Sequence, residues 1–118
     1  MTYVDGFVLA IKKDQIEAYR QIAEKACKVW MEYGALEYKE CVIDDDNIQG
    51  MRSFTEASAA KSDEIAIFAF IVYKSREHRD EVNAKVMADP RINEQSPEKM
   101  PFDCARMAYG GFKTIVEA

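Results

Sequence analysis

The feature that most constrains the fold is the unbroken apolar run from Ile65 to Tyr73. The run is far shorter than the roughly 20 residues that a membrane-spanning helix needs, and its β-branched and aromatic residues predict a strand. Alternate residues of a strand point to opposite faces, and here both sets are apolar. We therefore expect a central strand of a sheet that is covered on both faces.

The rest of the chain predicts two helices and three more strands around this run. We expect strands over 3–11, 36–43 and 106–117, and helices from Asp14 to Gly34, with Asp14 and Glu17 as a capping box, and from a Ser75 cap to about Met87, ended by Pro90. Residues 44–63 are predicted to form a long loop with a short helical turn after Thr55, and residues 91–103 a second irregular segment.

The element order strand, helix, strand, strand, helix, strand is that of the ferredoxin-like fold. It predicts an α+β protomer, one domain over residues 1–118, in which strands 3–11 and 65–73 lie in the centre of an antiparallel sheet and two helices cover one face. An apolar face without helices is typical of an interaction surface. We therefore expect a homodimer packed sheet to sheet; the alternative is a twisted sheet with scattered exposed apolar residues.

Composition excludes several classes of function. The net charge of −5 argues against nucleic-acid binding, because the electrostatic attraction to phosphate is missing. A single histidine excludes metal sites built from several imidazoles, and we expect no metal and no cofactor. The three cysteines, Cys27, Cys41 and Cys104, contain no C-x-x-C pair. They indicate small buried thiols in a reducing compartment, so we expect a cytoplasmic protein. The N-terminus lacks the pattern of a signal peptide and no apolar run is long enough to span a bilayer, so we expect neither a signal peptide nor membrane contact.

Four groups of residues resemble the YbaA-like bacterial family, a domain of unknown function, over essentially the whole chain. They are Tyr3-Val4-Asp5-Gly6; Val29-Trp30 with Tyr33-Gly34-Ala35; Tyr73-Lys74-Ser75-Arg76 with His78-Arg79-Asp80 and Asn83; and Met100-Pro101-Phe102-Asp103 with Tyr109-Gly110-Gly111-Phe112. The resemblance implies a homodimeric α/β barrel of two ferredoxin-like protomers and no known activity. Cys104 stands where the family carries glycine. A turn that needs positive φ at this position is therefore not expected here, because residues other than glycine rarely adopt it.

Seven residues are candidates for a functional site. His78, Asp103 and Tyr109 are the catalytic candidates, and Arg79, Arg106, Trp30 and Tyr38 are the ligand-binding candidates, because they combine a base, an acid, fixed cations and aromatic rings near element ends. Each also has a structural interpretation. His78 would be paired with a nearby carbonyl or carboxylate, Asp103 with Arg106, Arg79 with surface acids, and Trp30 and Tyr38 would be core residues.

Two functions remain open. One is a small-molecule pocket between the sheet and its helices, in a binding protein or a cofactor-independent enzyme; this rests on fold analogy. The other is a non-catalytic dimeric module for interaction or stress. An apolar cavity on which His78, Arg79, Asp103, Arg106 and Tyr109 converge favours the first. A solid core, or mutual pairing of Asp103 with Arg106 and of His78 with a carbonyl, favours the second.

Overall fold

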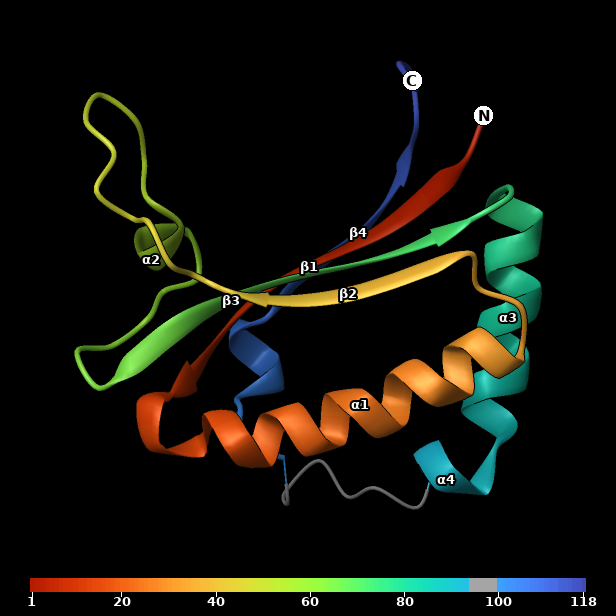
Figure 1. The fold of residues 1–118 in the computed structure, drawn as a ribbon, viewed down its shortest axis with the longest axis horizontal. Helices are drawn as coiled ribbons and strands as arrows, with labels where there is room; N and C mark the ends of the chain where they lie inside the picture. The colour runs from red at the N-terminus through yellow and green to blue at the C-terminus, as the bar shows by residue number, and fades with distance from the viewer. Residues whose placement is uncertain (94–99) are drawn as a thin grey trace.

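The computed structural model describes residues 1–93 and 100–118. Four strands form one antiparallel sheet in the order β2-β3-β1-β4, and the two long helices lie on one side of it (Figure 1). The predicted ferredoxin-like α+β fold is confirmed, with the two most apolar strands in the centre. The elements are β1 (Tyr3–Lys12), α1 (Ile16–Glu32), β2 (Glu37–Val42), α2 (Phe54–Ala57), β3 (Glu64–Tyr73), α3 (Arg76–Ala88), α4 (Pro90–Asn93) and β4 (Ala108–Lys113).

The register of β1 against β3 decides which side chains meet the helices. Phe7 pairs with Ala69 and Leu9 with Ile67, so the odd-numbered residues of both strands share one face. Leu9 and Ile67 on this face are buried with residues of α1. The hydrophobic core therefore lies between the sheet and the helices, and the polar odd-numbered residue Asp5 lies on the same covered face.

The predicted start of the first helix is wrong by two residues. Residues 13–15 form a single 3₁₀ turn, and α1 begins at Ile16 without a side-chain cap. The reason is a tertiary hydrogen bond: the Lys13 amide donates to the carbonyl of Asp63, 2.9 Å away, which holds the chain to the loop before β3. The predicted end is confirmed, since Gly34 follows α1 with φ +110°.

The second helix begins as predicted, because Ser75 Oγ accepts a hydrogen bond from the His78 amide at 3.1 Å. Pro90 ends α3 but also begins the short helix α4, since proline needs no partner for an amide in the first turn. The prediction of an irregular segment over 91–103 is therefore wrong for 91–93, and its part over 94–99 lies outside the described residues.

The last strand is shorter than predicted at both ends. Residues 104–106 form the 3₁₀ helix η3 (Cys104–Arg106), and β4 ends at Lys113 because its partner β1 begins at Tyr3. Among the described residues only Ala59 has a positive φ without being glycine, so η3 accommodates Cys104 without strain.

Cys27 is half-buried, whereas Cys41 and Cys104 are exposed, so the expectation of buried thiols is wrong for these two.

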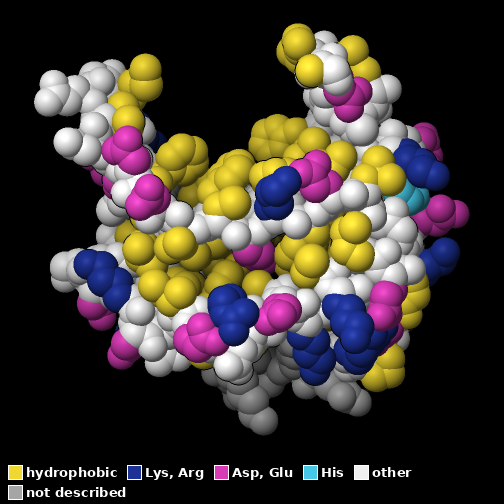
Figure 2. Space-filling model, in the orientation of Figure 1, with side chains coloured by type: hydrophobic (Ala, Val, Ile, Leu, Met, Phe, Trp, Pro, Cys, Tyr) yellow, Lys and Arg dark blue, Asp and Glu magenta, His cyan; other side chains and the backbone are white. Residues whose placement is uncertain are grey.

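The other face of the sheet carries no long helix. The even-numbered residues of β1 and β3 lie there, and Phe68 and Phe112 are 43% and 60% exposed. The short helix α2, which confirms the predicted turn after Thr55, touches this face through Phe54, whose ring centroid lies 5.9 Å from that of Phe68. Figure 2 shows a hollow with apolar side chains on its floor between two projecting arms. In the described part of the chain, no helix has the length and hydropathy to cross a membrane.

Candidate functional site

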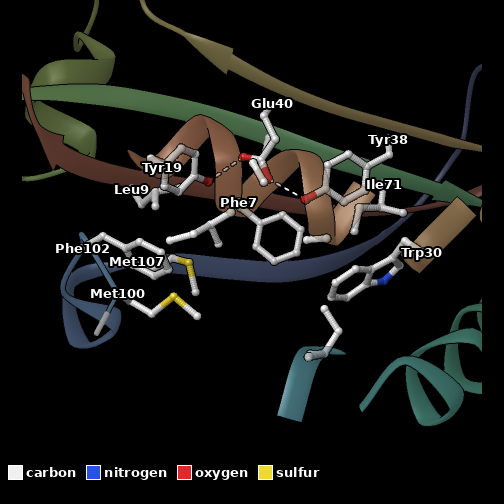
Figure 3. Close-up of a pocket in the computed structure, with 15 residues that line it drawn as sticks. Phe7, Leu9, Tyr19, Trp30, Tyr38, Glu40, Ile71, Met100, Phe102 and Met107 are labelled. Carbon is white, nitrogen blue, oxygen red and sulfur yellow. Dashed lines mark hydrogen bonds between the residues drawn. The ribbon is translucent and has the colours of Figure 1, made fainter. Parts of the chain in front are cut away.

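An apolar cavity of about 230 Å³ lies between the sheet and α1 (Figure 3). The sheet forms its floor, α1 forms one wall, and the segments around α4 and η3 form the other. It is lined by Phe7, Leu9, Tyr19, Ile22, Ala23, Ala26, Trp30, Tyr38, Glu40, Ala69, Ile71, Ile92, Met100, Phe102 and Met107.

The sequence explains why the core is hollow here. The α1 residues that line the cavity recur at spacings of three and four, so one helical stripe faces the sheet. Three positions around the cavity, Ala23 and Ala26 on α1 and Ala69 on β3, carry only a methyl group. Protein interiors are otherwise close-packed, and the small side chains leave open the space that larger apolar residues would fill.

Glu40 is the acidic residue among the described lining residues, and two tyrosines hold its carboxylate. Tyr19 donates its O–H to Oε1 and Tyr38 donates its O–H to Oε2, each at 2.6 Å (Figure 3). Burial raises the pKa of both phenols, and the neighbouring Glu40 carboxylate raises them further. The result is a carboxylate fixed between two neutral phenols at an otherwise apolar wall.

Trp30 lines the same cavity with its ring but turns its N–H away from it. The indole nitrogen donates to the Tyr73 hydroxyl and to Asn83 Oδ1, both at 3.1 Å. The Trp30 and Tyr38 rings lie 6.1 Å apart between centroids. The tryptophan therefore offers an aromatic surface to the cavity while its donor belongs to a second polar cluster.

That second cluster surrounds Asp5, whose side chain is only 1% exposed. Arg79 Nη1 donates to Asp5 Oδ1 at 2.8 Å and to the Tyr109 hydroxyl at 3.1 Å. Asn83 Nδ2 lies 3.5 Å from Asp5 Oδ2, and the Arg79 guanidinium lies 5.0 Å from the centroid of the Tyr3 ring. These contacts join β1, β4 and α3, so the cluster has a structural role. It also unites residues from all four sequence groups on which the family resemblance rests.

The structure divides the seven predicted site residues among separate places. Trp30 and Tyr38 line the cavity, and their role as ligand contacts stays a prediction. Arg79 and Tyr109 belong to the Asp5 cluster. The predicted pairing of Arg79 with surface acids is confirmed for Asp80, whose Oδ1 accepts a hydrogen bond from Nε at 2.7 Å. The predicted surface position is wrong, because the Arg79 side chain also pairs with the buried Asp5 and is only 13% exposed.

The other three candidates make structural contacts away from the cavity. His78 Nδ1 accepts the Lys74 amide at 2.9 Å, so its partner is a backbone N–H rather than a carbonyl. Arg106 pairs with Asp103 at 3.4 Å but more closely with Glu64, at 2.7 Å. The hydrogen bonds from Arg106 and the Lys61 amide lower the pKa of Glu64 to about 2. This pairing fastens η3, and with it the wall residue Met107, to the start of β3.

A similar ion pair holds the α4 part of the same wall. Asp89 accepts hydrogen bonds from Arg91 at 2.9 Å and from the Tyr33 hydroxyl at 2.8 Å, and these bonds hold the pKa of Asp89 well below its usual range. Arg91 also binds Glu32 of α1 at 2.8 Å. Because α4 is tied to the end of α1 in this way, Ile92 is positioned against the cavity.

Sequence reasoning did not select Glu40 or Tyr19. A signal for both existed: Glu40 is two residues after Tyr38 in an alternating strand and therefore shares its face, and Tyr19 belongs to the apolar stripe of α1. A carboxylate on the core-facing side of a strand indicates a buried polar partner. The described residues contain no group of three His, Cys, Asp or Glu side chains that could hold a metal ion.

Comparisons with known proteins agree with this architecture. The chain is 44% identical to the uncharacterized protein YbaA of Escherichia coli K12 over 117 residues, which is 99% of both chains, and a protein of the same name from Shigella flexneri matches to the same extent. A crystal structure of an uncharacterized NIPSNAP domain protein from Burkholderia xenovorans superposes with a TM-score of 0.62 and 11% identity, covering 98% of this chain and 97% of that one. This likeness shows the fold alone.

The family model described as a protein of unknown function (DUF1428) matches residues 2–104. This match, together with the full-length similarity to YbaA, confirms the resemblance found in the sequence. The chain belongs to the DUF1428 family.

Proposed function

We propose that the protein binds a small, largely apolar molecule in the cavity between the sheet and α1. The observation that carries this proposal is the cavity itself, about 230 Å³ with apolar walls and one polar spot. A cavity of about 150 Å³ with comparable walls accommodates benzene. The space therefore suits a single ring with small substituents. A cofactor-independent reaction at this site would use Glu40 as its base, because its carboxylate lies at the cavity wall.

The single tryptophan of the chain makes this proposal directly testable. Trp30 lines the cavity, so a bound molecule changes its fluorescence emission. We expect a saturable change with members of a library of single-ring compounds. Ala26→Leu fills part of the cavity and should weaken binding, whereas Ala18→Leu, on the exposed side of α1, should leave it unchanged. A library without any saturable binder would refute the proposal and leave the non-catalytic module, which the structural pairing of His78, Asp103 and Arg106 supports.

We also propose that the protein is a cytoplasmic homodimer that packs through its open sheet face. The apolar floor of this face supports the proposal, because a second copy related by a two-fold axis covers both floors at once. The free thiols support a reducing compartment. Native mass spectrometry should show a dimer for the unmodified protein and a monomer for Phe112→Asp. Met87→Asp, an exposed residue on α3, is the control and should stay dimeric; a monomeric unmodified protein would contradict the assembly.

A further inference from the structure

Among the residues that the structure describes, the polar spot of the cavity offers hydrogen-bond acceptors but no free donor. Tyr19 and Tyr38 have one O–H each, and both are engaged by Glu40. An ionised carboxylate has about four acceptor positions, so roughly two remain on Glu40, in addition to the lone pairs on the phenol oxygens. The indole N–H of Trp30 is directed at Tyr73 and Asn83. A ligand that forms hydrogen bonds at this spot therefore has to donate them.

The charge of the lining residues also favours a ligand that donates hydrogen bonds, in particular a cation. Among the described residues that line it, none is Lys, Arg or His, and Glu40 contributes a negative charge. A carboxylate or phosphate on a ligand would meet like charge and would lose its water without gaining donors in return. A cation gains a charge-assisted hydrogen bond to Glu40, which is stronger than one between neutral groups.

Aromatic rings flank the carboxylate. Tyr19 and Tyr38 lie on either side of Glu40 (Figure 3), and Trp30 lies beside Tyr38. Both tyrosines meet Glu40 through their hydroxyl groups, and the lone pairs of the two phenol oxygens are further acceptors beside the carboxylate. A neutral hydroxyl group would gain a hydrogen bond to Glu40 but not the attraction between opposite charges that an ammonium group gains, so the surroundings favour a charged donor over an uncharged one.

We infer that the cavity selects small apolar amines, with the ammonium group against Glu40 and the hydrocarbon part against the apolar walls. This inference rests on the proposed function and specifies its ligand class. The apolar wall opposite α1, with Phe102 and Met107, accounts for the hydrocarbon part. The carboxylate compensates the ammonium for its lost hydration, which a purely apolar cavity could not do.

Three probes of similar size test the inference: 2-phenylethylamine, n-propylbenzene and 3-phenylpropionate, each titrated against Trp30 fluorescence. We expect the amine to bind about tenfold more tightly than the hydrocarbon, because it adds a charge-assisted hydrogen bond, and the acid to bind most weakly. Glu40→Gln should reduce the affinity for the amine to about that for the hydrocarbon. Glu37→Gln, on the opposite face of β2, where Glu37 pairs with Lys39, should keep the full preference.

The outcomes separate this inference from the proposed function. Equal binding of amine and hydrocarbon would leave the cavity as a binding site and overturn the choice of amines. Tighter binding of the acid would overturn it as well. Failure of every probe, together with the single-ring library, would refute the proposed function itself. The comparison of the three probes on the unmodified protein decides the question even if Glu40→Gln does not fold.

Discussion

Two carboxylates on the core-facing side of the sheet have different surroundings. Asp5 in the central strand β1 is paired with the guanidinium of Arg79 and is almost fully buried. Glu40 in the edge strand β2 is half-buried, is held by two phenols, and borders a cavity. Asp5 therefore has a counter-charge that belongs to the fold, whereas the partners of Glu40 are neutral.

On the proposed function, this difference separates a structural group, Asp5, from a ligand-binding group, Glu40. A buried ion pair whose partners come from different elements fixes their arrangement, and loss of one partner leaves an uncompensated charge. A carboxylate that keeps acceptor positions toward a cavity can bind a ligand without disturbing the fold. Substitution of Asp5 should therefore lower the stability of the fold, whereas substitution of Glu40 should lower the affinity for a ligand and change the stability little.

The largest effect is expected for Asp5→Asn. The change leaves the Arg79 guanidinium without its buried counter-charge, and we expect a loss of about 3 kcal/mol in the free energy of unfolding, measured by urea denaturation. Asp80→Asn removes the exposed partner of Arg79 and should cost less than about 1 kcal/mol. A similar loss for both variants would show that Asp5 is not the anchor of this cluster.

Gly111→Ala tests the close packing around the same cluster. A Cβ atom at position 111 would lie 3.0 Å from Arg79 Nη1 and closer still to the Tyr3 hydroxyl. We expect a loss of about 1–3 kcal/mol, because β4 or the Tyr3 ring has to move. The neighbouring Gly110→Ala meets only ordinary contact, 3.7 Å from Phe112, and thermal unfolding should show little change for it. Equal melting temperatures for the two variants would contradict the close approach.

A third carboxylate, Glu64, should make a pH-dependent contribution to stability that lies between those expected for Asp5 and Glu40. Its pKa is lowered from 4.5 to about 2 by Arg106 and the Lys61 amide, so the charged form stabilises the fold. This contribution is complete above pH 4.5 and disappears as the pH falls toward 2. Glu64→Gln should therefore be less stable than the unmodified protein at neutral pH, and the difference should shrink in denaturation series below pH 4.5. A difference independent of pH would contradict the ion pair.

The sequence was sufficient for the fold because its strongest signals are local. The apolar runs of β1 and β3 predict central strands, Gly34 marks the end of α1, and Ser75 marks the start of α3. It was not sufficient for the site, because the partners of each polar residue depend on tertiary contacts. Arg79 resembles a surface residue among Asp80 and its acidic neighbours, yet it pairs with an aspartate from the first strand, which no local pattern shows.

Tertiary contacts also limit how much of the cavity lining can be predicted from the sequence. Trp30 and Tyr38 are selected because aromatic residues at helix and strand ends are obvious candidates. Glu40 is not selected, because a glutamate in a half-exposed strand normally lies in solvent. What makes it notable is its pair of phenol partners, one of which, Tyr19, lies on another element.

The smallest effect on stability is expected for Glu40→Gln. The amide oxygen can accept from one tyrosine and the amide N–H can donate to the other, and no ion pair of the described residues is broken, so the free energy of unfolding should change by less than about 1 kcal/mol. The phenol pKa values of Tyr19 and Tyr38 should fall, because the charge of Glu40 is removed, but stay above the ordinary 10.0, because burial remains. An ultraviolet titration of the tyrosines measures this.

The sign of the pH effect follows from those raised phenol pKa values. The fold keeps Tyr19 and Tyr38 neutral, so their contribution is complete below pH 10 and is lost as the pH rises above it. Removing the Glu40 charge should make this total loss smaller, because the phenol pKa values then lie closer to 10. If Glu40→Gln instead destabilised the fold as much as Asp5→Asn at neutral pH, Glu40 would be a structural group as well. The contrast between the two carboxylates, and with it the argument that Glu40 is available to a ligand, would then fail.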